Sequence, residues 1–167
     1  MAALSDYLES GLLNHVFRGT TFSPPPAIAI ALCSGVPQES DTGVNIEKGG
    51  NLWELPSGDG VIAIGYARQG LGNPKEVLEG GEINGDKKWN HTLDDINAGS
   101  GVIKNAQNIL FEQATVDWGV VSGIAITDSE EYGEGNLLMY AELDNPRTIY
   151  TGDSVKFDVT TLQISFN

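Results

Sequence analysis

Two strings of alternating apolar residues on either side of a glycine-containing turn constrain the fold more than any other feature of this sequence. The stretch GIAITDSEEYGEGNLLMYAEL begins with isoleucines at every second position and ends with a second alternating run. A period of two places alternate side chains on one face of a β-strand, and Gly133 and Gly135 permit a chain reversal. The pattern predicts an antiparallel hairpin with strands near 120–127 and 136–143.

Four carboxylates lie between the two strings: Asp128, Glu130, Glu131 and Glu134. A calcium loop needs oxygen ligands at alternating positions and usually a distal bidentate glutamate, and DSEEYGEG approaches that pattern only loosely. The alternation on both sides favours the other interpretation, in which the acids form the solvated tip of the hairpin. We therefore predict no metal site here.

Further alternating segments occur at 27–33, 61–68 and 154–166. In the first, isoleucine and leucine alternate with alanine, so one face is bulky and the other permits close packing. In the last segment the apolar residues occupy odd positions up to Val159 and even positions from Leu162 onward. This change predicts a bulge or turn near Thr160-Thr161, which keeps both sets on the inner face. Cys33, the single cysteine, ends the first segment and is predicted to be a small buried hydrophobe rather than a reactive thiol.

A short helix is predicted from Ser5, a suitable N-cap, to about Arg18, and the prolines of TTFSPPP then impose an extended connector. Helical spacing directs one face toward the core, formed by Leu4, Tyr7, Leu8, Leu12 and Val16. Leu13 and Phe17 lie outside the centre of that face, so the segment is apolar on two sides and predicts a partner surface. The candidate interface residues are Leu4, Tyr7, Leu13, Phe17 and Phe22.

The composition agrees with a fold of short strands and many turns. The chain has 167 residues, 21 glycines, 7 prolines and only 19% charged residues, which is typical of a single β-rich domain. Glycine-rich stretches at about 38–60 and 70–104 are predicted to be long loop insertions, with Asn84-Gly85 as a tight hairpin turn. The expected fold is an all-β antiparallel β-sandwich, immunoglobulin-like or jelly-roll-like, with one short N-terminal helix, over residues 1–167.

The charge excludes several classes of partner. Nine Lys and Arg residues against 23 Asp and Glu residues give a formal net charge of −14 at pH 7, which repels nucleic-acid phosphates and anionic lipids. The N-terminus lacks the basic start and apolar run of a secretion signal, and no apolar segment approaches the ~20 residues that span a bilayer. We expect neither a nucleic-acid partner nor a membrane.

No catalytic constellation is recognisable. His15 and His91 have no partner motif, and His15 is predicted to be a packed helix residue rather than a base. The segments GLGNPK and GSGVIKN fail both phosphate-binding patterns, and one cysteine with two distant histidines does not form a structural zinc set. We expect no enzyme activity and no cofactor.

Three aromatic residues in predicted loops leave two interpretations open. Trp53, Trp89 and Tyr132 could stack on sugar rings, since aromatic faces pack on the apolar faces of pyranoses. Scattered loop aromatics more often close the ends of a sandwich, which is the favoured interpretation. The first interpretation predicts a glycan site and the second predicts part of the core.

Several motifs, taken in order, resemble a family of short structural proteins of tailed-bacteriophage virions, some of them tail-fibre-like. These are ALSDYLESGLLNHVFRGTTFSPPPAIAIALCSGVP, GYARQ, DWGVVSGIAITD, GNLLMYAEL and TGDSVKFDVTTLQISF, of which the first is the most specific. The resemblance implies a β-sandwich that assembles on a virion without catalysis, after synthesis in the host cytoplasm. The sequence departs from the family in its glycine-rich material at 36–65 and 70–105, which we expect to form particle-specific contact loops.

Two functions follow from these observations. The first is an accessory or cement (decoration) protein, which binds major capsid or tail proteins through its N-terminal segment and loops and forms a homo-oligomer. The alternative is a tail-fibre or adhesion domain that recognises a bacterial surface glycan through loop aromatics. Assembly is favoured by the two-sided helix, the proline-stiffened connector and the long polar loops.

Overall fold

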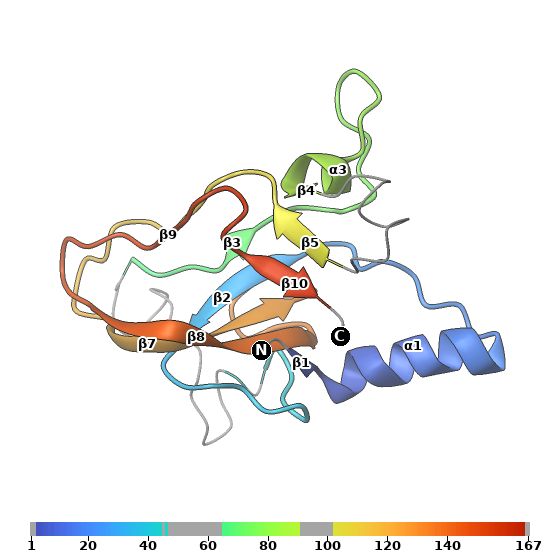
Figure 1. Ribbon diagram of the computed structural model, residues 1–167, viewed down its shortest axis with the longest axis horizontal. Coiled ribbons are helices and arrows are strands. Elements are labelled where there is room, and N and C mark those ends of the chain that lie inside the picture. The colour runs from blue at the N-terminus through green and yellow to red at the C-terminus, as the bar shows by residue number, and fades with distance from the viewer. Residues whose placement is uncertain (1–2, 45, 47–64, 91–101, 166–167) are drawn as a thin grey trace.

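The computed structural model describes residues 3–44, 46, 65–90 and 102–165, and in these ranges antiparallel strands dominate (Figure 1). One sheet has five strands in the order β1-β8-β7-β2-β3, a second has three in the order β10-β5-β4, and β6 pairs with β9. The helices are α1 (Asp6–Arg18) and α3 (Asn84–Lys88). The strands are β1 (Ala3–Leu4), β2 (Ala29–Cys33), β3 (Gln69–Gly70), β4 (Trp89–Asn90), β5 (Val102–Asn105), β6 (Ile109–Leu110), β7 (Gly119–Thr127), β8 (Leu137–Ile149), β9 (Lys156–Phe157) and β10 (Gln163–Ser165).

The predicted hairpin is the centre of the five-stranded sheet. Strands β7 and β8 pair antiparallel, with Ile124 opposite Ala141 and Ile126 opposite Met139. β8 continues to Ile149, six residues beyond the predicted end at 143, and there pairs with Gly119. The register of the β7–β8 pairing shifts between Val121 and Gly123, as at a β-bulge. Beyond this shift, β7 pairs with the part of β8 that extends past the predicted end.

Strand β2 has the two unequal faces that its alternation predicts. Ile30 and Leu32 belong to the main core cluster, whereas Ala31 and Cys33 pack on the other side of the sheet with Ile46. All five residues of β2 are fully buried, and Cys33 is a buried thiol, as predicted. Both faces of this part of the sheet are therefore covered.

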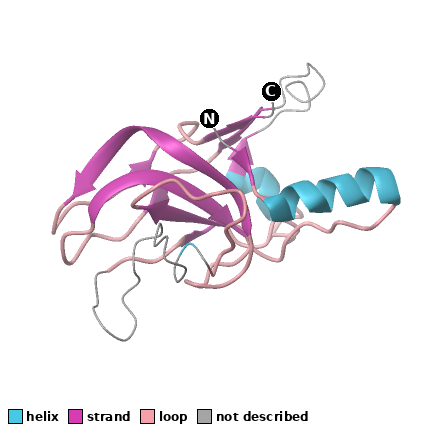
Figure 2. Cartoon of the chain, turned by 90° about the horizontal axis from the view of Figure 1, so that it is seen from below, coloured by secondary structure: helices cyan, strands magenta, loops and turns pink. Residues whose placement is uncertain are grey.

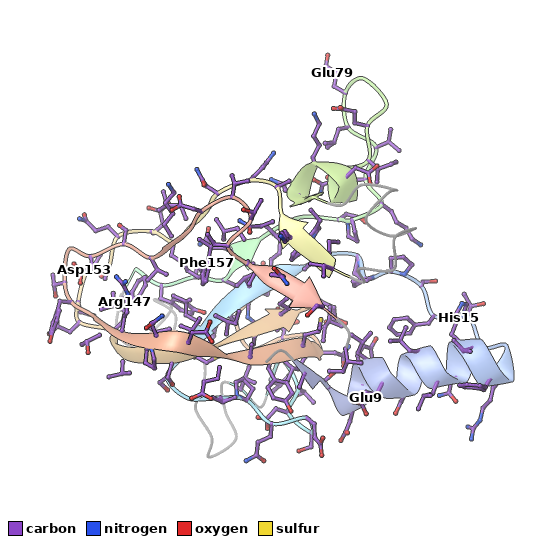
Figure 3. All side chains as sticks on the ribbon, viewed as in Figure 1. Glu9, His15, Glu79, Arg147, Asp153 and Phe157 are labelled. Carbon is purple, nitrogen blue, oxygen red and sulfur yellow. The ribbon has the colours of Figure 1, made fainter. Side chains whose placement is uncertain are left out.

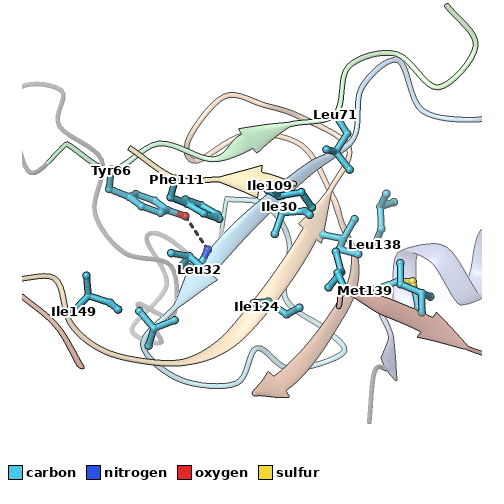
Figure 4. Packing of buried hydrophobic residues seen from close by; sticks show 14 of the residues in the cluster. Ile30, Leu32, Tyr66, Leu71, Ile109, Phe111, Ile124, Leu138, Met139 and Ile149 are labelled. Atoms are coloured by element: carbon cyan, nitrogen blue, oxygen red, sulfur yellow. Dashed lines mark hydrogen bonds between the residues drawn. The ribbon is translucent and has the colours of Figure 1, made fainter. Parts of the chain in front are cut away.

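The main core lies between the five-stranded and three-stranded sheets, which confirms the predicted antiparallel sandwich. Ile126 and Met139 come from the first sheet, and Trp89 and Ile164 come from the second. At one end Tyr66 stacks on Phe111 with ring centroids 6.1 Å apart. The Tyr66 hydroxyl accepts a hydrogen bond of 2.9 Å from the backbone N–H of Leu32, drawn as a dashed line in Figure 4.

The structure does not contain the hairpin turn predicted at Asn84-Gly85, and the strand predicted over 61–68 is only partly described. Asn84 and Gly85 form no hairpin turn but begin α3, because the buried Asn84 amide donates to the carbonyls of Leu71 (3.0 Å) and Asn73 (2.9 Å). The strand predicted over 61–68 lies outside the described residues up to 64, and residues 65–68 are not in a strand.

The parity change in the last segment is confirmed as a turn. Thr160 has a positive φ of 67°, and the N–H of Thr161 donates to the carbonyl of Asp158 at 3.1 Å. This turn separates β9 from β10, which belong to different sheets. The apolar residues on the two sides of the turn can therefore both face inward.

A buried arginine fixes the turn end of the β7–β8 hairpin. Arg68 is 5% exposed, and its guanidinium donates to the carbonyls of Gly43 (2.9 Å), Ser129 (3.1 Å) and Glu134 (2.9 Å). Gly43 also donates its N–H to Gly135 at 3.0 Å, so backbone from three parts of the chain meets around one side chain. Without the guanidinium the buried Gly43 carbonyl and the partly buried Glu134 carbonyl would lose a donor, while the Ser129 carbonyl would keep its hydrogen bond from the Thr127 hydroxyl at 2.8 Å.

We expect Arg68→Met to lower the free energy of unfolding by about 2–4 kcal/mol, because it leaves the buried Gly43 carbonyl without a donor and removes two partly buried hydrogen bonds at the hairpin turn. Urea denaturation followed by tryptophan fluorescence measures this. Arg147→Met is the matched control, since Arg147 is exposed on β8 and its loss should change stability by less than about 0.5 kcal/mol. Equal midpoints for the two variants would contradict the role given to Arg68.

Candidate functional site

Helix α1 is joined to the sandwich by Ser5. Ser5 is fully buried, and its backbone N–H donates to the carbonyl of Leu138 at 3.0 Å. Its hydroxyl donates to the carbonyl of Leu137 and accepts from the N–H of Leu8 at 3.3 Å, which is the N-cap interaction that the sequence predicts. The preceding strand, β1, pairs with β8. The start of α1 is therefore part of the sheet edge.

Beyond its first turns α1 extends away from the sandwich (Figure 2). Leu8 is half-buried and packs on the core, but no residue of the helix is buried. The prediction that Leu12 and Val16 face the core is wrong, because these side chains are 37% and 67% exposed. No helix in the described ranges is both long enough and apolar enough to cross a membrane.

The connector after α1 returns along one side of the helix. Phe22 is half-buried, lies against Gly11, where a Cβ would collide with its ring, and meets Tyr7 edge-on at 6.2 Å. His15 Nδ1 lies 3.0 Å from the carbonyl oxygen of Thr20 and 3.4 Å from the N–H of Phe22. These contacts hold the helix to its own connector. His15 is exposed rather than packed as predicted, and its ring nitrogen lies against the connector backbone.

The predicted interface residues separate into two groups. Leu4 packs on the core from β1, whereas Tyr7, which is 43% exposed, and half-buried Phe22 contact each other and hold the connector to the helix. Leu13 and Phe17 are 57% and 79% exposed. Together with two neighbouring exposed side chains they lie at i, i+1, i+4 and i+5, on one side of α1. We call Leu12, Leu13, Val16 and Phe17 the apolar stripe.

Carboxylates surround the start of α1, and we call Asp6, Glu9, Glu39 and Asp41 the acidic collar. The N–H of Asp6 donates to the carbonyl of Glu39 at 2.8 Å, and the carboxylate of Asp41 accepts from the N–H of Gln38 at 2.9 Å. The collar was not predicted, because half of it comes from a loop about 30 residues later in the sequence. Figure 3 shows Glu9 near the start of the helix and His15 near its other end.

The pKa of Tyr140 on β8 depends on the charges of the acidic collar. Burial raises the pKa of its phenol, and the negative charges of the four collar carboxylates raise that pKa further. β8 presents Tyr140 opposite Ala3 of β1, directly beside the start of α1. The negative potential therefore falls on the side of the molecule from which the helix leaves.

The acids at the hairpin tip do not all behave alike. Glu131 and Glu134 are exposed, as a solvated tip requires, whereas the exposed Glu130 carboxylate accepts a hydrogen bond from the backbone N–H of Gly72 at 3.0 Å. Asp128 is half-buried and accepts hydrogen bonds from the backbone N–H and the side-chain amide of Asn136, so it closes the turn. The described residues contain no group of three or more His, Cys, Asp or Glu side chains placed to hold a metal ion.

The aromatic residues proposed for glycan binding do not form a shared platform in the described structure. Trp89 is 7% exposed and belongs to the core, Tyr132 is half-buried against it, and Trp53 lies outside the described residues. Trp89 does line a hollow of about 380 Å³ beside α1. Among the described lining residues only Asp86 and the indole N–H of Trp89 offer polar side-chain groups, whereas sugar hydroxyls require several hydrogen-bonding groups.

A small antiparallel sandwich with a braced, unburied apolar helix has the form of a structural subunit that attaches to other proteins. Residues 3–165 match the model of a family described as podophage GP4 fiber I protein gp80. The chain belongs to this family and is a virion structural protein of tailed phages, as the sequence motifs suggest. Comparison with curated proteins gives no significant match.

The Tyr140 environment predicts a measurable titration. Because its folded pKa is raised, the stability contributed by the neutral phenol is complete below the ordinary value of about 10 and is lost as pH rises through the folded pKa. NMR titration of ¹³Cζ-labelled tyrosine should place Tyr140 above 10, and Glu9→Gln with Glu39→Gln should lower its pKa. A Tyr140 pKa at or below 10 in the wild type would contradict this electrostatic description.

Proposed function

We propose that this protein is a non-enzymatic structural component of a phage fibre and that it attaches to another virion protein through the apolar stripe of α1. The observation that carries the proposal is the exposure of the stripe, which reaches 79% at Phe17, on a helix whose start is fixed by Ser5. Exposed side chains of this size, gathered on one side of one element, are typical of an interaction site.

The energetics of the stripe support attachment. Full coverage of Leu13 and Phe17 would contribute roughly 1.5–3 kcal/mol each. An isolated helix of 13 residues is marginal in water, but here the cap at Ser5 and the contacts of Phe22 hold it in place. The surface is thus ordered before the partner binds, which reduces the entropy cost of association.

The family description favours a fibre component over capsid decoration, which was the first expectation from the sequence. Decoration has no specific support among the described residues. The partner is a virion protein, and the capsid and tail proteins expected from the sequence remain candidates for it. The protein would be made in the host cytoplasm and reside in the virion. Homo-oligomerisation stays a prediction.

A fibre component could also recognise a host glycan, which is the alternative function. The family description is compatible with it, but the burial of Trp89 and the apolar lining of the neighbouring hollow do not support it. A non-enzymatic role is supported by the family, which is described as a fibre protein.

The test is the double variant Leu13→Ser with Phe17→Ser, expressed by a phage that lacks the wild-type gene. Both side chains are exposed, so the protein should fold with an unchanged circular dichroism spectrum and melting temperature. Its copy number in purified particles, measured by quantitative mass spectrometry, should fall at least about tenfold, because the loss of about 3 kcal/mol of burial corresponds to two orders of magnitude in affinity.

Val77→Ser with Val120→Ser is the matched control, since these valines are 66% and 50% exposed on the body of the protein. This control should incorporate normally. Normal incorporation of the α1 variant would place the attachment site elsewhere. Loss of folding in that variant would show that the stripe is needed for stability in the isolated chain.

A further inference from the structure

We propose that the partner of α1 is a different protein with a cationic surface, in which an apolar groove for the stripe is rimmed by Lys and Arg side chains that face the acidic collar. The inference rests on the proposed function and specifies the chemistry of the partner. A second copy of this chain is the competing occupant.

The collar and the stripe form one continuous surface along α1. Asp6, Glu9, Leu13 and Phe17 follow one another at intervals of three, four and four residues, which keeps them on the same side of a helix. A protein that covers Leu13 and Phe17 therefore also faces Glu9 and Asp6. The backbone hydrogen bond between Asp6 and Glu39 adds the loop carboxylates to the same end of that surface.

The basic residues of α1 do not neutralise the collar. His15 is turned toward the connector. Arg18 is twelve residues after Asp6, which corresponds to about 18 Å along the helix axis at 1.5 Å per residue. This separation exceeds the Debye length of about 10 Å at 0.1 M salt, so Arg18 leaves the collar's field in place.

A second copy is a poor electrostatic match for this surface. The formal net charge of each chain is −14, so two copies repel each other. Parallel pairing of two α1 helices would bring the two collars together. Antiparallel pairing would direct Glu9 of one copy toward the C-terminal end of the other helix, where Arg18 offsets the negative helix dipole, but the two chains would still approach against their net charges of −14 each. A cationic partner removes this net repulsion.

The experiment uses purified particles of the encoding phage that lack this protein as the probe, and measures the association rate of the full-length protein with them. For the wild type we expect the rate to fall at least about tenfold between 50 and 500 mM NaCl, because rim charges act mainly on association and its salt dependence. The variant Asp6→Asn, Glu9→Gln, Glu39→Gln, Asp41→Asn should associate several-fold more slowly at 50 mM NaCl. Over the same salt range its rate should change by less than about twofold.

A matched control removes four exposed carboxylates elsewhere, by Glu79→Gln, Glu112→Gln, Glu131→Gln and Asp144→Asn. It changes the net charge equally and should keep most of the wild-type salt dependence. Two smaller variants, Asp6→Asn with Glu9→Gln and Glu39→Gln with Asp41→Asn, keep the test valid if the fourfold collar variant fails to fold. Each should lose part of the salt dependence.

The outcomes separate this inference from the proposed function. A collar variant that binds like the wild type, while Leu13→Ser with Phe17→Ser does not bind, overturns the cationic partner and leaves attachment through α1 intact. Normal binding by both variants overturns both proposals. A wild-type rate that is independent of NaCl also overturns the inference. Sedimentation of the pure protein as an oligomer that the Leu13 and Phe17 substitutions dissociate would identify a second copy as the occupant.

Discussion

The buried serine at the start of α1 is the interaction on which the functional surface depends. Ser5 joins strand β8 to helix α1. Its backbone N–H and its hydroxyl donate hydrogen bonds to carbonyls of β8, and the same hydroxyl oxygen accepts a hydrogen bond from the first turn of the helix. A sheet edge and a helix N-terminus each leave backbone groups unpaired, and this one residue serves both. The direction of α1, and so the position of the stripe, follows from that junction and from the packing of Phe22.

Much of the sandwich was predictable because its central strands have strong local signals. The period-two runs around the hairpin and in β2 require a buried face, which determines strand position and register. The local sequence predicted the wrong element where a contact between residues distant in the sequence determines the backbone conformation. Asn84-Gly85 is a good turn sequence in isolation, yet the amide of Asn84 is used by the carbonyls of Leu71 and Asn73, and a helix forms instead.

The candidate surface was predictable only in part. Two-sided apolarity of the N-terminal segment indicated that Leu13 and Phe17 lie away from the core, and both are exposed, while their role in an interface stays a prediction. Periodicity does not show how far along its length a helix remains in contact with the core, so Leu12 and Val16 were wrongly assigned to it. The collar combines α1 with the loop that follows β2, and such a combination depends on tertiary structure.

The most direct test of attachment through α1 is a cryo-electron microscopy structure of the assembled virion at a resolution that shows side chains. We expect another virion protein to cover Leu13 and Phe17 and to place basic side chains near Glu9 and Glu39. A particle in which this protein is bound through its loops, with α1 exposed to solvent along its whole length, would contradict this expectation.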